Sequence, residues 1–265
     1  YKMVWWDPVP DKEALLQALA ARIAGHDAGP HLRQAWRLVS EAIPLQPELP
    51  SYYNGPYYLG PAHPMCADPG AELPQVFYGK YLFLAEMSDK EGLPSRPTFV
   101  TSPTGSVPIF GKLYRRMEDL LGRAVAEIET AAPKVPARCR LTFEAEASPI
   151  RWFYATARTE ANFYESCPIR DRLTALALKG DLTDAEREEA AELYNRWRAI
   201  LSDELDNTRA ALPVVEADMR LDFYYGGDHT FPHAADMIRA KLAILEQELK
   251  DYLPGLASRC GLSQD

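Results

Sequence analysis

Apolar residues recur at intervals of three and four along most of the chain, which is the spacing of one buried helix face. Between Asp11, a residue type that caps helices, and Gly25, which ends them, the apolar positions are Leu15, Leu16, Leu19 and Ile23. A second run over about 30–43 has one face that carries Leu32, Ala35, Trp36, Val39 and Ala42. The two runs predict a short helical hairpin.

The second half of the chain repeats this pattern over longer stretches. One helix is expected from about 113 until Pro133, and another over 150–178, with Pro168 kinking or breaking it and Gly180 ending it. Residues 138–147 fit either a short strand or the start of that second helix. The Thr183–Glu186 capping box begins a third helix, which is expected to end near 212.

The last predicted helix has the most regular period. Its apolar residues alternate steps of four and three, as in the seam of an antiparallel bundle, and they are Phe231, Ala235, Ile238, Leu242, Leu245, Leu249 and Tyr252. Helices of this length need partners of similar length. The second half therefore predicts an antiparallel bundle of long helices.

Residues 44–112 interrupt the helical pattern. Repeated prolines rule out long helices through most of this region, although 76–87 is compatible with a short one. We therefore expect an all-α fold with a large Pro/Tyr-rich loop excursion. Residues 1–112 would form the hairpin and the irregular region, and residues 113–265 would form the long-helix bundle, with the two parts packed as one unit.

The most unusual segment is Ser51–Pro64, whose sequence is SYYNGPYYLGPAHP. Aromatic faces stack on the apolar faces of sugar rings or other planar ligands, and phenol, amide and imidazole groups add directional hydrogen bonds. The candidate ligand-binding residues here are Tyr52, Tyr53, Asn54, Tyr57, Tyr58 and His63. The alternative is that these tyrosines pack the loop onto the bundle. Trp5 and Trp6 raise the same choice between ligand contact and core packing.

Charged residues are concentrated in two of the predicted helical segments, 158–171 and 203–222. Such groups form hydrogen-bonded clamps between helices, or they line a polar pocket that holds a general acid and a base. Glu144 and Glu146 would share one face of a strand, but nothing in the sequence places them across a ligand as a glycosidase pair. Phosphate-binding loops, nucleophile elbows and dinucleotide fingerprints do not occur.

Metal and cofactor sites are not expected. His229 and His233 are four residues apart, but Pro232 lies between them and no glutamate completes a zinc-binding helix motif. The four cysteines, at positions 66, 139, 167 and 260, form no C-x-x-C pair. We expect buried free thiols, and one disulfide remains open if the protein is secreted.

Composition and charge narrow the class of protein. The 265 residues are 47% hydrophobic and 25% charged, which is typical of a folded domain. A net charge of −9 disfavours binding to nucleic acid or to an anionic membrane, because both need clustered Lys and Arg. No apolar run approaches the roughly 20 residues of a membrane span. A soluble protein is expected, and the sequence does not decide between a cytoplasmic and a secreted location.

Several segments together resemble the helical region that follows the catalytic barrel in some large bacterial glycoside hydrolases. They are Trp5–Pro8, Leu15–Ala20 with Gly25, Ala35–Ala42, the tyrosine-rich segment, Asp203–Arg209 and Asp218–Phe223. The resemblance implies a C-terminal piece of such an enzyme, which begins at the last barrel strand and has Trp5 and Trp6 near the sugar site. The acid and the nucleophile of these enzymes lie on barrel strands, which a chain of this length and helicity does not contain.

The leading hypothesis is therefore a helical domain that shapes or completes a glycan-binding site, with carbohydrate as ligand. Its expected protein partner is an upstream catalytic barrel or a second copy of the chain. Two alternatives remain open. One is a protein interaction or oligomerisation module that docks a partner on a bundle face, and the other is an independent enzyme with a polar site between 158–171 and 203–222.

Overall fold

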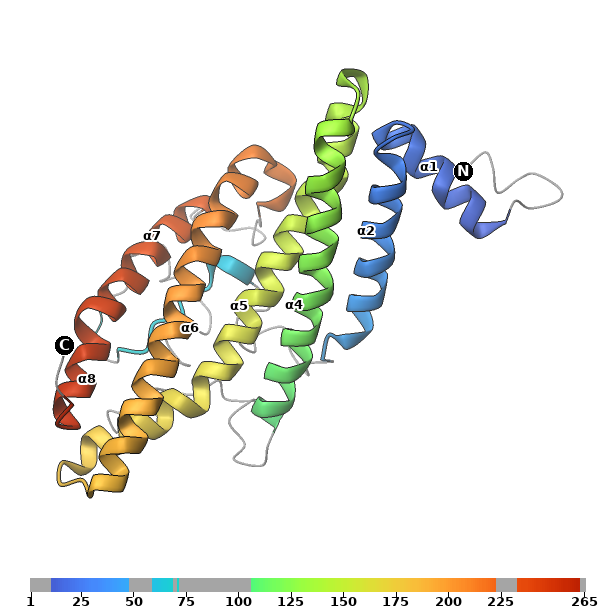
Figure 1. Cartoon of the computed structure of the whole chain (residues 1–265). Coiled ribbons are helices and arrows are strands. Elements are labelled where there is room, and N and C mark those ends of the chain that lie inside the picture. The colour runs from blue at the N-terminus through green and yellow to red at the C-terminus, as the bar shows by residue number, and fades with distance from the viewer. Residues whose placement is uncertain (1–10, 48–58, 69–70, 72–105, 223–232, 263–265) are drawn as a thin grey trace, which may run out of the picture.

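The computed structural model describes residues 11–47, 59–68, 71, 106–222 and 233–262. Within these ranges the chain is all α-helical and contains no strand, so the predicted fold class is confirmed there. Four helices lie side by side, and neighbours in the row run in opposite directions (Figure 1); they are α2 (Gly29–Ala42), α4 (Ser106–Ala131), α5 (Arg140–Lys179) and α6 (Asp184–Ala217). The predictions for 1–10, 48–58, 76–87 and 223–232 lie outside the described residues.

The predicted N-terminal hairpin is confirmed. Helix α1 (Lys12–Ala24) is capped by Asp11, whose carboxylate accepts a hydrogen bond of 3.0 Å from the backbone N–H of Ala14. Gly25 ends the helix at a φ of 90°, and a Cβ there would lie 2.6 Å from Cδ of Pro136. Helix α2 packs between α1 and α4, and the 3₁₀ turn η2 (Ile43–Leu45) follows it.

Helix α5 decides between the two alternatives left open for residues 138–147. Residues 140–147 are helical rather than a strand, because Phe143, Ala147 and Ile150 bury one face at helical spacing. The helix also continues through Pro149 and Pro168 instead of breaking at the second proline. It ends at Lys179, and Gly180 follows at a φ of 78° as predicted.

Helix α6 begins with the predicted capping box. The Thr183 hydroxyl accepts from the N–H of Glu186, and the Glu186 carboxylate accepts from the N–H of Thr183 at 2.9 Å. The helix passes Pro213 and ends at Ala217, beyond the predicted end near 212. Helix α4 begins at Ser106, so the predicted division between 112 and 113 falls inside one helix.

The C-terminal helices follow one another without a gap. Helix α7 (Ala234–Gln247) leads into a π-helical turn, η9 (Glu248–Tyr252), and then into α8 (Leu253–Arg259). A proline ring inside a helix clashes with the carbonyl four residues earlier, and we attribute the wider turn to Pro254. The turn brings Glu248 into the protein interior, where 2% of this residue is exposed.

Three clusters of buried apolar side chains hold the helices together. The largest joins α4, α5, α6 and the C-terminal helices around Trp197 and Tyr164. All four cysteines are buried and free, as expected. Among the helices that are described, none is both long and apolar enough to span a membrane.

Candidate functional site

Residues 59–68, which we call the anchored loop, begin directly after Tyr58 and are almost entirely buried. The loop includes the 3₁₀ turn η4 (Gly60–Ala62), packs against α5, α6 and α7, and appears in cyan in Figure 1. Loops usually run over the surface, because a buried one must find partners for its backbone N–H and C=O groups. The side chains that supply these partners define the candidate site.

The backbone of the anchored loop is conformationally demanding. Gly60 has a φ of 52°, and a Cβ there would lie 2.6 Å from Oγ1 of Thr156. Met65 has a φ of 51°, which is a costly value for a side chain of this size. Its N–H donates a hydrogen bond of 3.2 Å to Nδ1 of His63. Such strain persists only where surrounding contacts fix the backbone, so the neighbouring helices must hold this loop firmly.

Lys241 of α7 holds the first half of the loop. Its Nζ donates a hydrogen bond of 3.0 Å to the carbonyl oxygen of Pro61 and also binds Oε1 of Glu204 on α6. Both side chains of this ion pair are completely buried. Glu204 also accepts hydrogen bonds from the Thr159 hydroxyl at 2.6 Å and from the Asn162 amide at 2.8 Å. Burial lowers the pKa of Lys241 although Glu204 opposes the shift.

Glu248 holds the second half of the loop. Its Oε1 accepts hydrogen bonds from the N–H groups of Ala67 and Asp68, at 2.8 and 2.9 Å, and from the Cys66 thiol at 3.2 Å. The second oxygen, Oε2, is buried and has no hydrogen-bond partner. Burial raises the pKa of Glu248 to about 7, although the two backbone N–H groups oppose the shift.

Lys241 and Glu248 are seven residues apart, which places them two turns apart on one helical face. The Lys241 ammonium group donates to a backbone carbonyl of the loop, and the Glu248 carboxyl group accepts from backbone N–H groups. The two side chains therefore satisfy both kinds of backbone polar group in the loop. Neither residue was expected at the site, because the inward face of this helix was predicted from its apolar residues alone. The sequence does contain a signal for buried charges, because Lys241 and Glu248 lie seven residues apart within the apolar stripe of this helix.

His63 is buried, with 1% of the residue exposed, and therefore does not face outward as expected for a surface ligand contact. Burial and the nearby Lys241 charge hold its pKa well below the usual value, so the ring is neutral. Because Nδ1 accepts from the N–H of Met65, the proton of the neutral ring is assigned to Nε2. The ring packs edge-to-face against Phe163, with 5.2 Å between centroids.

A small enclosed cavity lies beside the anchored loop. His63, Cys66, Ser166 and Arg170 contribute its polar lining, and Trp197 is among its apolar walls. Its volume of about 10 Å³ is at the lower limit for one water molecule and far too small for a sugar ring. The Cys66 thiol donates to Glu248, and burial raises the pKa of this thiol, so it is not an activated nucleophile.

The two charged segments predicted from the sequence do meet in space. Arg158 donates from Nε and Nη2, which form one edge of the guanidinium group, to the two carboxylate oxygens of Asp203. The Asn162 amide donates to Asp203 at 2.9 Å and to Glu204 at 2.8 Å. Asn162 also accepts a hydrogen bond of 3.0 Å from Arg115 of α4. A hydrogen-bonded network therefore extends from half-buried groups on α4 to the ion pair that holds the anchored loop.

This network contains carboxyl groups with opposite pKa shifts. Burial raises the pKa of Glu118, although Arg115 and Arg158 oppose it. For Asp203, burial favours a raised pKa, but hydrogen bonds from Arg158 and Asn162 prevail and lower it. Both carboxylates are held by arginines, which suits a clamp that joins α4, α5 and α6.

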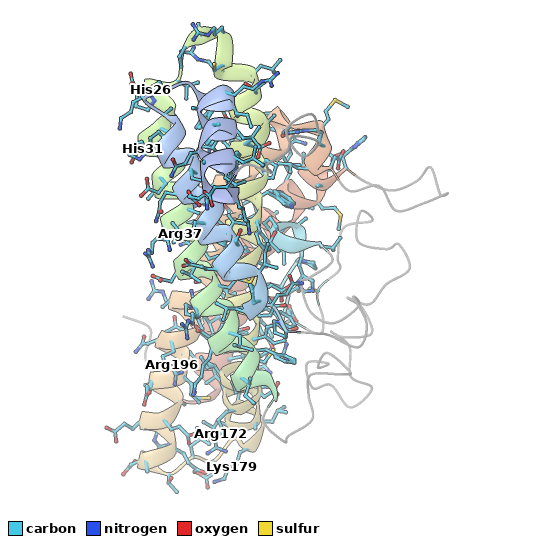
Figure 2. The ribbon with its side chains drawn as sticks, turned by 90° about the vertical axis from the view of Figure 1, so that its right-hand side faces the viewer. His26, His31, Arg37, Arg172, Lys179 and Arg196 are labelled. Carbon is cyan, nitrogen blue, oxygen red and sulfur yellow. The ribbon has the colours of Figure 1, made fainter. Side chains whose placement is uncertain are left out.

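The basic side chains labelled in Figure 2 lie at different points along the length of the bundle. The labelled Arg37, Arg172, Lys179 and Arg196 each form an ion pair with a glutamate. Exposed pairs of this kind contribute about 0–1 kcal/mol each. This face therefore carries locally compensated charges.

Of the eight ligand-binding residues expected from the sequence, the structure describes only His63. The other seven, which lie outside the described residues, are Trp5, Trp6, Tyr52, Tyr53, Asn54, Tyr57 and Tyr58. Glu144 and Glu146 do not face each other across a ligand, since Glu144 binds Arg151 and Glu146 accepts from the Trp36 indole. No cluster of metal-binding side chains occurs in the described part of the chain.

Comparison with known proteins gave no match to any family model, curated protein or solved structure.

Proposed function

We propose that this helical domain binds carbohydrate through the tyrosine-rich segment, and thereby shapes or completes the glycan-binding site of a glycoside hydrolase. The proposed ligand contacts are Tyr52, Tyr53, Asn54, Tyr57 and Tyr58, with Trp5 and Trp6 as further candidates. In this proposal the catalytic carboxyl groups belong to an upstream barrel, as the sequence resemblance implies.

The observation that carries the proposal is the anchoring of residues 59–68. Residues 51–58, which carry the four tyrosines of the segment, lead directly into the anchored loop, which Lys241 and Glu248 hold at both ends. A segment that is fixed at one end loses less conformational entropy when it binds a ligand, and recognition loops on rigid scaffolds commonly have this advantage. Aromatic side chains next to such an anchor suit the stacking of a sugar ring.

The size of the interior cavity supports a surface site rather than an internal one. The space lined by His63 and Arg170 accommodates at most about one water molecule. This cavity therefore cannot hold a sugar ring. We accordingly drop His63 as a direct ligand contact and treat it as part of the support.

Isothermal titration calorimetry against a panel of oligosaccharides tests the proposal. At least one sugar should bind, and Tyr57→Ala should weaken binding about tenfold, which corresponds to about 1.4 kcal/mol. Tyr57→Phe should retain more of the affinity, because it keeps the stacking ring and removes only the hydroxyl. The same pair of substitutions at Tyr52 provides an independent repeat.

Leu141→Ala is the control for a general effect of removing an exposed side chain, because Leu141 is 84% exposed and lies in the first turn of α5. It should leave the affinity unchanged. The proposal fails if no sugar gives heat with the folded protein. It also fails if Tyr52→Ala and Tyr57→Ala bind as tightly as the wild type.

A second candidate is an independent acid–base enzyme, which the opposite pKa shifts of Glu118 and Asp203 favour. Both carboxyl groups contact Arg158: Glu118 lies 3.7 Å from its Nε, and Asp203 accepts two hydrogen bonds from Nε and Nη2. Assays on a panel of aryl glycosides would test it, with Asp203→Asn as the inactive variant. Absence of turnover by the wild-type chain would eliminate this candidate.

A further inference from the structure

The environment of Glu248 is unusual because the carboxyl group is buried without a cation. No Lys, Arg or His forms an ion pair with Glu248 in the described part of the chain. Oε1 accepts three hydrogen bonds from the anchored loop, whereas Oε2 is buried and has no partner. A buried carboxylate that lacks a counter-charge is much less favourable than a buried neutral acid.

The charged and titratable groups around Glu248 come from several elements. The anchored loop contributes Cys66 and Asp68, which act in opposite directions: the Asp68 charge raises the pKa of Glu248, whereas the hydrogen bond from the Cys66 thiol lowers it. Tyr252, on the same π-helical turn, interacts with Glu248 and with Arg170 of α5. The contact from α6 is apolar, since the Trp197 ring packs edge-to-face on Tyr252 at 6.2 Å.

Hydrogen bonds to Ala67 and Asp68 do not require an ionised partner. A protonated carboxyl group still presents Oε1 as a carbonyl acceptor to both N–H groups. Loss of the proton adds a charge that the two N–H groups and the Cys66 thiol stabilise less than burial disfavours it. Water stabilises this charge further when the loop moves away and exposes the group. Deprotonation therefore favours the open loop, and protonation favours the closed one.

We infer that Glu248 and the backbone of Cys66–Asp68 form a proton-dependent latch, which loosens the base of the anchored loop as the carboxyl group ionises. The latch is independent of carbohydrate binding and of any partner. Its π-helical turn is a local feature of a kind that often occurs at functional sites. The turn places the carboxyl group directly against the loop backbone.

The size of the effect follows from the two states of the carboxyl group. Its pKa is about 7 in the closed loop, against 4.5 for an unperturbed glutamate in the open one. The opening constant is the equilibrium constant between the closed and the open anchored loop. Because the open loop binds the proton less tightly, this constant should rise roughly 70-fold between pH 5 and pH 8. His63, on the same loop, acts in the opposite direction, because its neutral ring becomes protonated more readily once exposed. A comparison with Glu248→Gln removes the His63 contribution.

Hydrogen–deuterium exchange of the peptide that contains Ala67 and Asp68 measures the opening constant. Rates should be corrected for intrinsic exchange at each pH and measured in wild type, Glu248→Gln and Glu246→Gln. Glu246 is an exposed glutamate two residues away and serves as the matched control. The ratio of wild-type to Glu248→Gln opening constants should rise roughly 70-fold from pH 5 to pH 8. Glu246→Gln should behave as the wild type.

A ratio that changes less than about threefold across this range would overturn the latch, since linkage requires a much larger change. If Glu248→Gln does not fold, a ¹³C NMR titration of the Glu248 side chain in the wild type replaces it. A midpoint near the value of about 7 supports the latch, and a midpoint near 4.5 overturns it.

Discussion

Replacing Lys241 with Met tests the buried ion pair that holds the anchored loop. Methionine keeps an unbranched apolar stem in a completely buried position but removes the ammonium group. Glu204 then keeps its hydrogen bonds from Thr159 and Asn162 but loses its counter-charge. The carbonyl of Pro61 loses its donor as well.

The expected loss of stability can be worked from these contacts. Removing one partner of a buried ion pair costs about 3–5 kcal/mol, and the remaining donors to Glu204 favour the lower end of that range. The unpaired carbonyl adds about 1 kcal/mol. We expect Lys241→Met to lower the free energy of unfolding by about 4 kcal/mol, which is a large fraction of the 5–15 kcal/mol typical of a folded protein.

Urea denaturation followed by circular dichroism measures this loss. Glu204→Gln and the double variant complete a double-mutant cycle, in which the two side chains should show a coupling of about 2 kcal/mol. Lys250→Met is the matched control, because Lys250 is an exposed lysine on the same C-terminal helical segment. Its effect should stay within about 0.5 kcal/mol.

The reasoning is refuted if Lys241→Met costs less than about 1 kcal/mol, which is the level of a surface substitution. It is also refuted if the cycle shows no coupling between Lys241 and Glu204. Either result would mean that the ion pair is hydrated or absent in solution, and the loop would then lack its first anchor.

Three further predictions concern stability. Gly60→Ala should lower the melting temperature, with a cost of about 2 kcal/mol, because a Cβ at φ 52° meets Thr156; an unchanged melting temperature would contradict the loop geometry. Thr183→Ala should cost about 1 kcal/mol in urea denaturation through the lost cap of α6, and no loss would mean that this end frays. His63 has a folded-state pKa below its unfolded value, so the stability of the wild type relative to His63→Gln should fall as pH drops from 7 to 5; parallel pH profiles would refute a buried neutral ring.

The arrangement of helices could be predicted because local signals and tertiary packing agree. Asp11, Gly25 and the capping box at Thr183 each act within one helical turn, and the structure places all three at helix ends. Pro168 left a kink or a break as the expectation for α5, and packing against α4 and α6 sustains the helix through this proline. Local propensity alone does not include that contribution.

The support of the anchored loop could not be predicted in the same way. Lys241 contacts Pro61 across 180 positions of sequence, and Glu248 reaches Ala67 across 181. Period analysis assigns helix faces from apolar residues, so it treats a charged residue within the stripe as solvent-exposed. Asn162 and Glu204 were found only as members of charged segments, because their roles depend on which helices lie side by side.

The tyrosine-rich segment remains a prediction, and a crystal structure with the oligosaccharide that binds most tightly in calorimetry tests it most directly. We predict a sugar ring stacked on at least one of Tyr52, Tyr53, Tyr57 and Tyr58, next to an anchored loop still held by Lys241 and Glu248. A sugar bound elsewhere on the protein, with those four rings covered by neighbouring segments, would contradict the account.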